Sequence, residues 1–361
     1  MSMEKFSEED LLVEEEQEEE TVTINYDIAS YPSDFTLSGI TQMWKDKDII
    51  IPDYQREFVW SINQASLLID SFLCGLPVPP VFFYVDDKNK NLVIDGQQRI
   101  LSIVFFLEGY FGEESSQGKR KVFRLSGLDD KNPFSNKTFE ELDETFQRKL
   151  KQAVLRAVNI RQLNPVGEGT SAYHIFERLN TGGTPLKPQE IRNCVFRGGF
   201  NKLLKEMNKN KSWRRILGKQ NIDKHQKDVE LLLRIFSLVG AADKYEKPMK
   251  EFLNKTMVNH DKGDTDKVTN FVKAFEKVTE AVVASIGDKP FHLRGPLNLA
   301  ALDSVMSVLI ENFKKIDSLN LKERYSKLKA DKDFDEYTKF NTTDFKTVIG
   351  RIGKVKEIML G

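Results

Sequence analysis

The sequence is poor in the residues that would mark an exported or membrane-bound protein. Its 361 residues include only two cysteines, Cys74 and Cys194, both in apolar, helix-like surroundings, so we expect buried thiols rather than a disulfide or a metal pair. The longest nearly apolar run, residues 100–107, is far shorter than the ~20 residues of a membrane-spanning helix. The first residues are acidic, where a secretory signal would be basic and then apolar. These absences predict a cytoplasmic protein without a membrane partner.

Net charge is also nearly absent, but the two signs are unevenly distributed. The chain has 54 Lys and Arg against 55 Asp and Glu, a formal charge of −1. Residues 1–20 hold ten acids and one base, a charge of −9, so the remaining 341 residues carry +8. A near-zero total therefore does not exclude a body that binds nucleic acid or another anion.

Length and pattern predict two domains of α+β class. Residues 1–22 are too charged to bury a core, and we expect an acidic disordered tail. A first domain of mixed strands and helices is expected at residues 23–165, and a mostly helical region at residues 166–361.

The first domain begins with a clear series of local signals. Leu37, Ile40 and Trp44 have helical spacing after Thr36, and Ser61 and Gly75 are typical of the start and end of a helix. Short strands are predicted at residues 49–51, 78–85 and 92–94, the last two as a hairpin. A buried helix follows residue 99, another helix is predicted at residues 140–152, and a strand at residues 153–160.

The second half shows helical spacing almost throughout, with no 20-to-50-residue repeat. Helices are predicted at residues 171–180, 188–196, 200–208, 228–239, 266–286, 300–316 and 345–360.

Five polar residues, Asp95-Gly96-Gln97-Gln98-Arg99, stand between a predicted strand and a predicted helix. Gly96 permits a tight turn, and a helix N-terminus attracts anions. Arg99 is suited to phosphate, and Gln97 or Gln98 could donate to a phosphate or orient a water. Asp95 could bind a metal ion or a ribose. The alternative is that Asp95 only caps the helix and the glutamines are solvated.

Two further polar clusters flank this pentapeptide in sequence. In Tyr54-Gln55-Arg56-Glu57, with Trp60 nearby, an arginine lies next to a possible stacking surface. The segment at residues 176–186 contains Arg178 beside a Gly-Gly turn. The alternatives are a loop with a half-buried tryptophan and a plain connection between two helices.

The three clusters, in this order, resemble the N-terminal domain of the GmrSD type IV restriction system, a family marked by a DGQQR motif. The similar segments are IPDYQREFVW (51–60), DGQQR (95–99) and FERLNTGGTPLKPQEIRN (176–193), with a looser match at residues 228–239. The resemblance implies a ParB/sulfiredoxin-like α+β core followed by a helical region. It also implies nucleoside triphosphate binding and hydrolysis, and a role in restriction or anti-phage defence.

The resemblance also implies roles for single residues. The catalytic set is Asp95, Gln97, Gln98 and Arg99, and the nucleotide-binding set is Gln55, Arg56, Gly96, Arg99, Arg178 and Asn180. Asp95 would hold Mg²⁺ that accompanies the nucleoside triphosphate. DNA, a separate nuclease subunit or a second copy of the chain are the further partners expected.

Fuller members of the family carry an HNH nuclease, which needs paired histidines over a metal. The chain has four histidines, His174, His225, His260 and His292, and none forms such a pair. The nearest fragment, Asn259-His260-Asp261, is expected in a loop. The sequence thus predicts no HNH domain and a nuclease supplied by a partner.

Two alternatives to a nucleotide hydrolase are left open. Basic segments at residues 202–211, 213–215 and 219–227 would suit a non-enzymatic DNA-binding module. A ParB-like nuclease is the other alternative, although the sequence offers no dedicated metal cluster. In either case the acidic tail could compete with an anionic ligand, or it could simply aid solubility.

Overall fold

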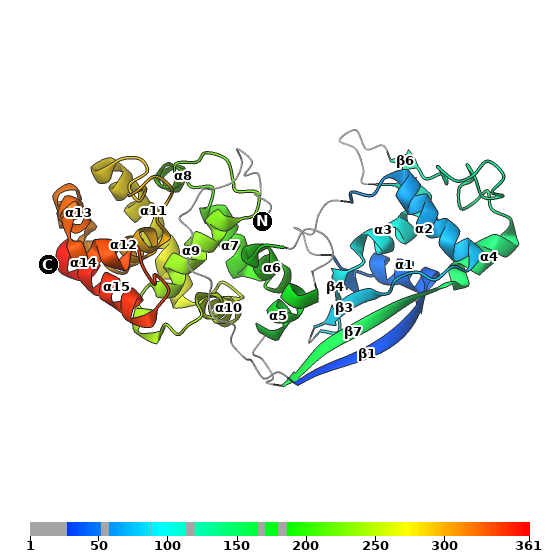
Figure 1. Cartoon of the computed structure of the whole chain (residues 1–361), viewed down its shortest axis with the longest axis horizontal. Coiled ribbons are helices and arrows are strands. Elements are labelled where there is room, and N and C mark those ends of the chain that lie inside the picture. Colours follow the sequence, from blue (N-terminus) through cyan, green and yellow to red (C-terminus); the bar gives the residue numbers. More distant parts are fainter. Residues whose placement is uncertain (1–26, 52–57, 87, 113–119, 165–169, 180–185) are drawn as a thin grey trace. The chain divides into compact units, whose positions relative to one another are not determined.

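The computed structural model describes residues 27–51, 58–86, 88–112, 120–164, 170–179 and 186–361. The chain divides into two compact units between Leu186 and Lys187. The predicted domain boundary between residues 165 and 166 lies outside the described residues, as does the predicted acidic tail. Each unit is described by itself below (Figure 1).

The first unit is built on a five-stranded mixed sheet with the strand order β1-β7-β3-β4-β2. The strands are β1 (Asp27–Thr36), β2 (Ile49–Ile50), β3 (Val81–Val85), β4 (Asn91–Asp95) and β7 (Val154–Asn164). β1 pairs with β7 and β3 with β4 in antiparallel fashion, whereas the β3–β7 and β2–β4 pairs are parallel. A separate two-stranded ribbon joins β5 (Tyr110–Phe111) to β6 (Lys121–Val122).

Four helices form the apolar core of this unit with one face of the sheet. They are α1 (Leu37–Lys45), α2 (Ile62–Cys74), α3 (Gln97–Leu107) and α4 (Glu144–Gln152). Val81 and Phe83 of β3 and Val93 of β4 point into this core and are fully buried. Because successive strand residues face opposite sides, Leu92 and Ile94 point the other way, yet they are buried too. Helix α5 (Thr170–Leu179) packs against β4. In the sheet, β4 lies between β3 and β2 and is therefore an interior strand.

The helix signals read from the sequence are confirmed where they are local. Thr36 caps α1 by accepting from the amide of Gly39, at 3.1 Å. Ser61 and Gln64 form a capping box at the start of α2, and Gly75 ends that helix with φ of +77°. These side chains satisfy backbone groups that a helix leaves unpaired at its ends.

The second unit is helical. Its helices are α6 (Pro188–Val195), α7 (Gly199–Met207), α8 (Lys211–Leu217), α9 (Lys227–Leu238), α10 (Met249–His260), α11 (Asp266–Ile286), α12 (Leu299–Glu311), α13 (Leu321–Ala330), α14 (Lys332–Tyr337) and α15 (Phe345–Leu360), with 3₁₀ turns η1 (Ala242–Lys244) and η2 (Phe313–Ser318). Residues 299–310 of α12 are all buried, and so is most of α9. A helix that is buried all round lies at the centre of a fold, so α9 and α12 form the core of this unit.

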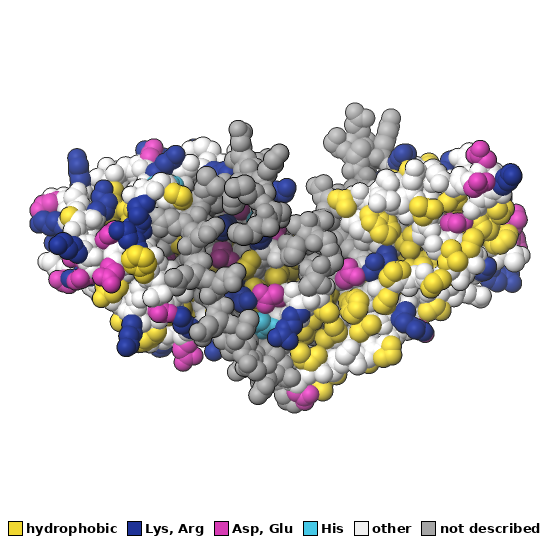
Figure 2. Space-filling model, in the orientation of Figure 1, with side chains coloured by type: hydrophobic (Ala, Val, Ile, Leu, Met, Phe, Trp, Pro, Cys, Tyr) yellow, Lys and Arg dark blue, Asp and Glu magenta, His cyan; other side chains and the backbone are white. Residues whose placement is uncertain are grey.

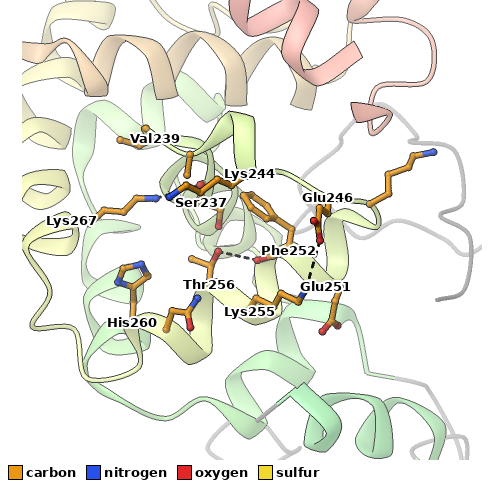
Figure 3. A pocket seen from close by; sticks show the side chains of 14 residues that line it. Ser237, Val239, Lys244, Glu246, Glu251, Phe252, Lys255, Thr256, His260 and Lys267 are labelled. Carbon is orange, nitrogen blue, oxygen red and sulfur yellow. Dashed lines mark hydrogen bonds and ion pairs between the residues drawn. The ribbon is translucent and has the colours of Figure 1, made fainter. Parts of the chain in front are cut away.

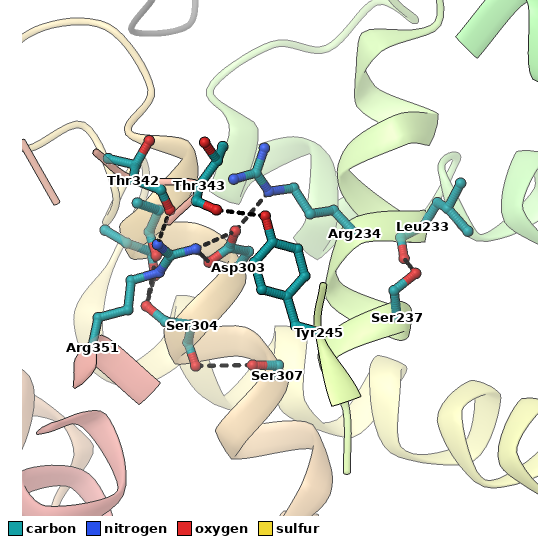
Figure 4. Close-up of polar contacts among 12 residues, drawn as sticks. Leu233, Arg234, Ser237, Tyr245, Asp303, Ser304, Ser307, Thr342, Thr343 and Arg351 are labelled. Atoms are coloured by element: carbon teal, nitrogen blue, oxygen red, sulfur yellow. Dashed lines mark hydrogen bonds and ion pairs between the residues drawn. The ribbon is translucent and has the colours of Figure 1, made fainter. Parts of the chain in front are cut away.

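Three charged side chains interact at the centre of the helical unit (Figure 4). Asp303 of α12 accepts from Arg234 Nε at 2.6 Å and from Arg351 Nη2 at 3.0 Å. All three residues are at most 2% exposed. A carboxylate shared by two guanidinium groups links α9, α12 and α15 through charge-assisted hydrogen bonds.

The surface of the first unit carries many apolar side chains. Figure 2 shows them spread over the face where Figure 1 places β1 and β7. Tyr31 of β1 is 40% exposed, and Val154 of β7 is 50% exposed. Apolar residues of the outer strand β1 and of its neighbour β7 therefore contact solvent here.

The α+β class, a small mixed sheet followed by a helical region, is confirmed. Two expectations were wrong, because Cys74 is exposed at the end of α2, and residues 259 and 260 belong to helix α10 rather than to a loop. Strand β1 and helices α8, α10, α13 and α14 were not predicted. Both cysteines are free, and Cys194 is buried as expected. No helix of the described residues is long and apolar enough to cross a membrane.

Candidate functional site

The candidate site lies where β4 ends and α3 begins. Asp95 is the last residue of β4, Gly96 is the N-cap of α3, and Gln97 is its first helical residue. The first intrahelical bond runs from Ile100 N to Gly96 O at 2.9 Å. The N-cap residue Gly96 has no side chain with which to cap this helix end, so within the described residues the positive end of α3 has no carboxylate or hydroxyl from its own N-cap.

Gly96 is required by the geometry of the junction. Its φ of +100° lies in the region that side chains rarely adopt. A Cβ atom at this position would lie 2.3 Å from Val81 Cγ1 and 3.2 Å from Arg99 Nη2. Glycine therefore allows β3, β4 and the first turn of α3 to approach closely.

Arg99 is held against the junction by two acceptors. Its Nη2 donates to Asp95 Oδ2 at 2.7 Å and to the carbonyl of Pro80 at 3.0 Å. The Arg99 side chain is 17% exposed, whereas that of Asp95 is 53% exposed. Arg99 Nε is buried and has no hydrogen-bond partner in the described part of the chain. The guanidinium is thus fixed in direction, and part of its donor capacity is unused.

Gln98 ties a distant segment to the first turn of α3. Its Oε1 accepts from the backbone amides of Val59, at 3.0 Å, and Trp60, at 3.2 Å. These residues directly follow residues 52–57. Gln98 therefore has a positioning role that the sequence did not indicate, and Gln97 beside it is half-buried.

Of the predicted site residues outside the pentapeptide, only Arg178 lies within the described residues. Arg178 is exposed on α5, the helix that packs against β4. Gln55, Arg56 and Asn180 lie outside the described residues. The structure thus gathers the pentapeptide with residues 59, 60 and 80, and places the helix that carries Arg178 against the same strand.

Among the described residues of this junction, Asp95 is the carboxylate that could contact a metal ion. Asp95 accepts from Arg99 through Oδ2, and its side chain is largely open to solvent. Mg²⁺ is commonly held by one or two carboxylates together with substrate phosphates, so Asp95 fits a metal that arrives with a nucleotide. Among the described residues no group of three or more His, Cys, Asp or Glu side chains could hold a metal by itself.

One basic segment of the second unit, residues 213–215, is less available than its sequence suggests. Trp213 is fully buried, and Arg214 is 4% exposed and donates to Asp228 at 2.7 Å. Arg215 pairs with Asp288 at 2.7 Å. Two of the three residues at 213–215 therefore serve the core, and the arginine that remains is paired.

Two of the four histidines, His225 and His260, have local partners. His260 Nδ1 lies 2.7 Å from Thr265 Oγ1, and His225 Nδ1 lies 3.2 Å from Glu190 Oε1. Burial, and then the charge of Lys267, lower the pKa of His260. The segment Asn259-His260-Asp261, which was expected in a loop, lies at the C-terminal end of α10.

Residues 37–197 match the family model of the GmrSD restriction endonuclease, N-terminal domain. The match contains the β4–α3 junction and all three polar clusters, and it confirms the resemblance over this segment. Comparisons with curated proteins and with solved structures give no match.

Sequence reasoning missed the backbone partners of the pentapeptide. The carbonyl of Pro80 and the amides of Val59 and Trp60 come from segments 19 to 39 residues away. Every residue has a backbone carbonyl and almost every residue has a backbone amide, so no local sequence pattern could have identified these hydrogen-bond partners.

Proposed function

We propose that the chain binds a nucleoside triphosphate at the β4–α3 junction and hydrolyses it, as part of restriction or anti-phage defence. The observation that carries the proposal is Arg99, a partly buried guanidinium fixed beside a helix N-terminus whose N-cap residue, Gly96, has no capping side chain. Both groups attract phosphate oxygens, and they lie within one helical turn of each other. The family match over residues 37–197 supports the restriction setting.

The residues at the junction would divide the work of binding. Gly96 would let the turn pack closely enough against β3 to hold the first turn of α3 in place, and Arg99 would stabilise negative charge as the terminal phosphoryl group is transferred. Gln97 would orient the attacking water. Gln98 would hold residues 59 and 60 against the site, and thereby position the preceding segment that contains Gln55 and Arg56.

Magnesium would be held by Asp95 and the phosphates, and it would neutralise charge on the phosphate oxygens. Arg178 and Asn180 would close the site from the side of α5. Cytoplasmic DNA, or a separate nuclease, would be the downstream target of the hydrolysis cycle.

The test is phosphate release from each of the four ribonucleoside triphosphates with Mg²⁺ present. We expect Arg99→Ala to reduce release at least tenfold. Arg156→Ala is the matched control, because Arg156 is also an arginine of the first unit paired to an aspartate, Asp34, at 3.2 Å. It should retain full activity. Circular dichroism of each variant shows whether folding is intact. Equal rates for folded wild type and folded Arg99→Ala would reject the proposal.

DNA binding by the helical unit is the second candidate. Exposed lysines on α7 and in the segment before α9, such as Lys202 and Lys224, favour it. Binding of duplex DNA should weaken steeply between two salt concentrations if phosphate contacts dominate. Retention of DNA binding in Arg99→Ala would separate this function from nucleotide hydrolysis.

A further inference from the structure

The helical unit contains a pocket of about 460 Å³ that the proposed nucleotide site does not use (Figure 3). It is formed by the end of α9, the turn η1 and one side of α10, with Lys267 of α11 closing one end. Its volume is in the range of small-molecule sites. The pocket is therefore large enough for a ligand of the size of a mononucleotide.

Lysines are the prominent charged groups of the pocket. Lys244, Lys247, Lys255 and Lys267 line it, together with Glu246 and Glu251. Two of the lysines have carboxylate partners, since Lys247 pairs with Asp344 and Lys255 lies 4.0 Å from Glu246. The positive charge left over is at the end formed by Lys244 and Lys267.

Lys244 and Lys267 extend toward one another (Figure 3). Neither forms an ion pair within the described residues, and burial together with the charge of Lys244 lowers the pKa of Lys267 to about 8. Glu311 of α12 attracts Lys267, but its carboxylate pairs with Lys356 at 3.1 Å. His260 of α10, which also lines the pocket, has a lowered pKa and adds no negative charge. Two like charges thus converge without a shared counter-charge.

Contacts among the described residues account for the position of the Lys267 ammonium group but not for that of Lys244. Lys267 Nζ donates to the carbonyl of Ser237 at 3.4 Å and lies 4.7 Å from the centre of the Phe236 ring. It therefore interacts with the negative end of α9, as a cation near a helix C-terminus does. Lys244 has no such contact among the described residues, and its charge opposes that of Lys267.

We propose that this pocket binds the phosphate group of a small phosphomonoester between Lys244 and Lys267. A dianion matches two ammonium groups, and lysine binds phosphate as a point charge. Phe252, whose ring packs edge-on against Tyr245 at 5.2 Å, supplies an apolar wall for the organic part. Asn259 and Thr256, which also line the pocket, offer polar groups beside it.

The test compares thermal unfolding of the full chain in inorganic phosphate, in a nucleoside monophosphate, and in chloride at equal ionic strength. All samples carry Arg99→Ala, which weakens binding at the proposed nucleotide site. The response of the pocket can therefore be tested even if the proposed nucleotide function is rejected. We expect phosphate or the monophosphate to raise the melting temperature more than chloride does. If only the monophosphate acts, the organic part is required, and if both act, the phosphate group suffices.

Variants assign the effect to the two lysines. Lys267→Met and Lys244→Met should each weaken phosphate binding about tenfold, the loss typical of one charge-assisted contact. Lys273→Met is the matched control, since Lys273 is exposed on the same helix, α11, and does not line the pocket. It should respond like Arg99→Ala alone.

Three results would overturn the proposal. They are an equal response to chloride, an unchanged phosphate response in both Lys267→Met and Lys244→Met, and displacement of the monophosphate by duplex DNA at lower concentration. The second would show that neither lysine binds the phosphate, and the third that the surface binds a nucleic acid.

Discussion

The guanidinium of Arg99 donates to the carboxylate of Asp95, one turn earlier, at 2.7 Å. This ion pair spans the end of β4 and the first turn of α3, and it places opposite charges at the site where a nucleotide is proposed to bind. Either residue can then be tested for its own contribution.

Asp95→Asn should separate binding from hydrolysis. Loss of the negative charge frees Arg99 for phosphate, so triphosphate affinity without Mg²⁺ should be unchanged or tighter. Release of phosphate with Mg²⁺ should fall at least tenfold, because the metal loses its carboxylate. Titration calorimetry with EDTA and a phosphate-release assay measure the two effects. Asp34→Asn, at the other aspartate–arginine pair, should change neither.

Gly96→Ala should destabilise the first unit much more than Gly75→Ala. Both glycines have positive φ, +100° and +77°, so both substitutions carry a backbone cost of about 1 kcal/mol. Only at position 96 would the new Cβ meet Val81, at 2.3 Å, whereas position 75 has nothing within 4 Å. Overpacking adds about 1–3 kcal/mol, measured as the difference in free energy of unfolding. Equal losses would show that the junction relaxes around the added methyl group.

Gln98→Ala should release the segment that follows residue 57. The substitution removes two backbone hydrogen bonds, at residues 59 and 60, worth about 0.5–1.5 kcal/mol each. Hydrogen exchange at these two amides should accelerate. Gln98→Glu keeps an acceptor oxygen and should preserve most of the protection. Unchanged exchange in Gln98→Ala would contradict the positioning role.

Asp303→Asn should unfold or strongly weaken the helical unit. It leaves Arg234 and Arg351 buried without a full counter-charge, which costs about 3–5 kcal/mol. Asp288→Asn is the control at an exposed pair, where the aspartate side chain is 58% exposed, and it should cost less than about 1 kcal/mol. Urea unfolding followed by circular dichroism compares the two.

Lys267→Met should stabilise the protein at neutral pH. The pKa of Lys267 is about 8 in the folded chain against 10.5 for a free lysine, so below pH 8 both states are protonated and the folded state bears the cost of a buried charge. Between pH 8 and 10.5 the unfolded state binds more protons, and stability of the wild type rises with pH. The advantage of Lys267→Met, about 1–3 kcal/mol at pH 7, should therefore shrink across this window. A constant difference between the two proteins from pH 7 to 10.5 would contradict the lowered pKa.

Local signals in the sequence predicted most of the helices. The limits of α2 follow from Ser61 and Gly75, because capping depends on residues within one turn of the helix end. The same holds for the β3–β4 hairpin and for the polar turn into α3. For these elements the information lies in neighbouring residues.

Strand β1 could not be predicted in this way. Its sequence, DIASYPSDFT, mixes strand-favouring residues with a proline, two aspartates and two serines, and it is extended because it pairs along its length with β7. The paired residues Thr36 and Val154 are more than a hundred positions apart. Such pairing depends on the whole fold.

The same limit applies to charged residues. Arg214 stands in a basic segment, but Asp228 lies beside it only after α8 and α9 have packed. Lys244 and Lys267 are likewise distant in sequence, and nothing in either neighbourhood indicates that they share a pocket. Charge in a sequence is therefore a weak guide to a binding surface until burial and partners are known.

The place of β1 as the outer strand of the described sheet has a consequence for how the protein behaves at high concentration. An open sheet edge is a template on which strands of other molecules can add. Pro32, in the middle of β1, has no amide hydrogen to offer, and Asp34 brings a charge to the same strand. The strand is thus ill-suited to continue the sheet into a neighbouring molecule, and replacing Pro32 with a β-branched residue would remove a safeguard against fibrous aggregation.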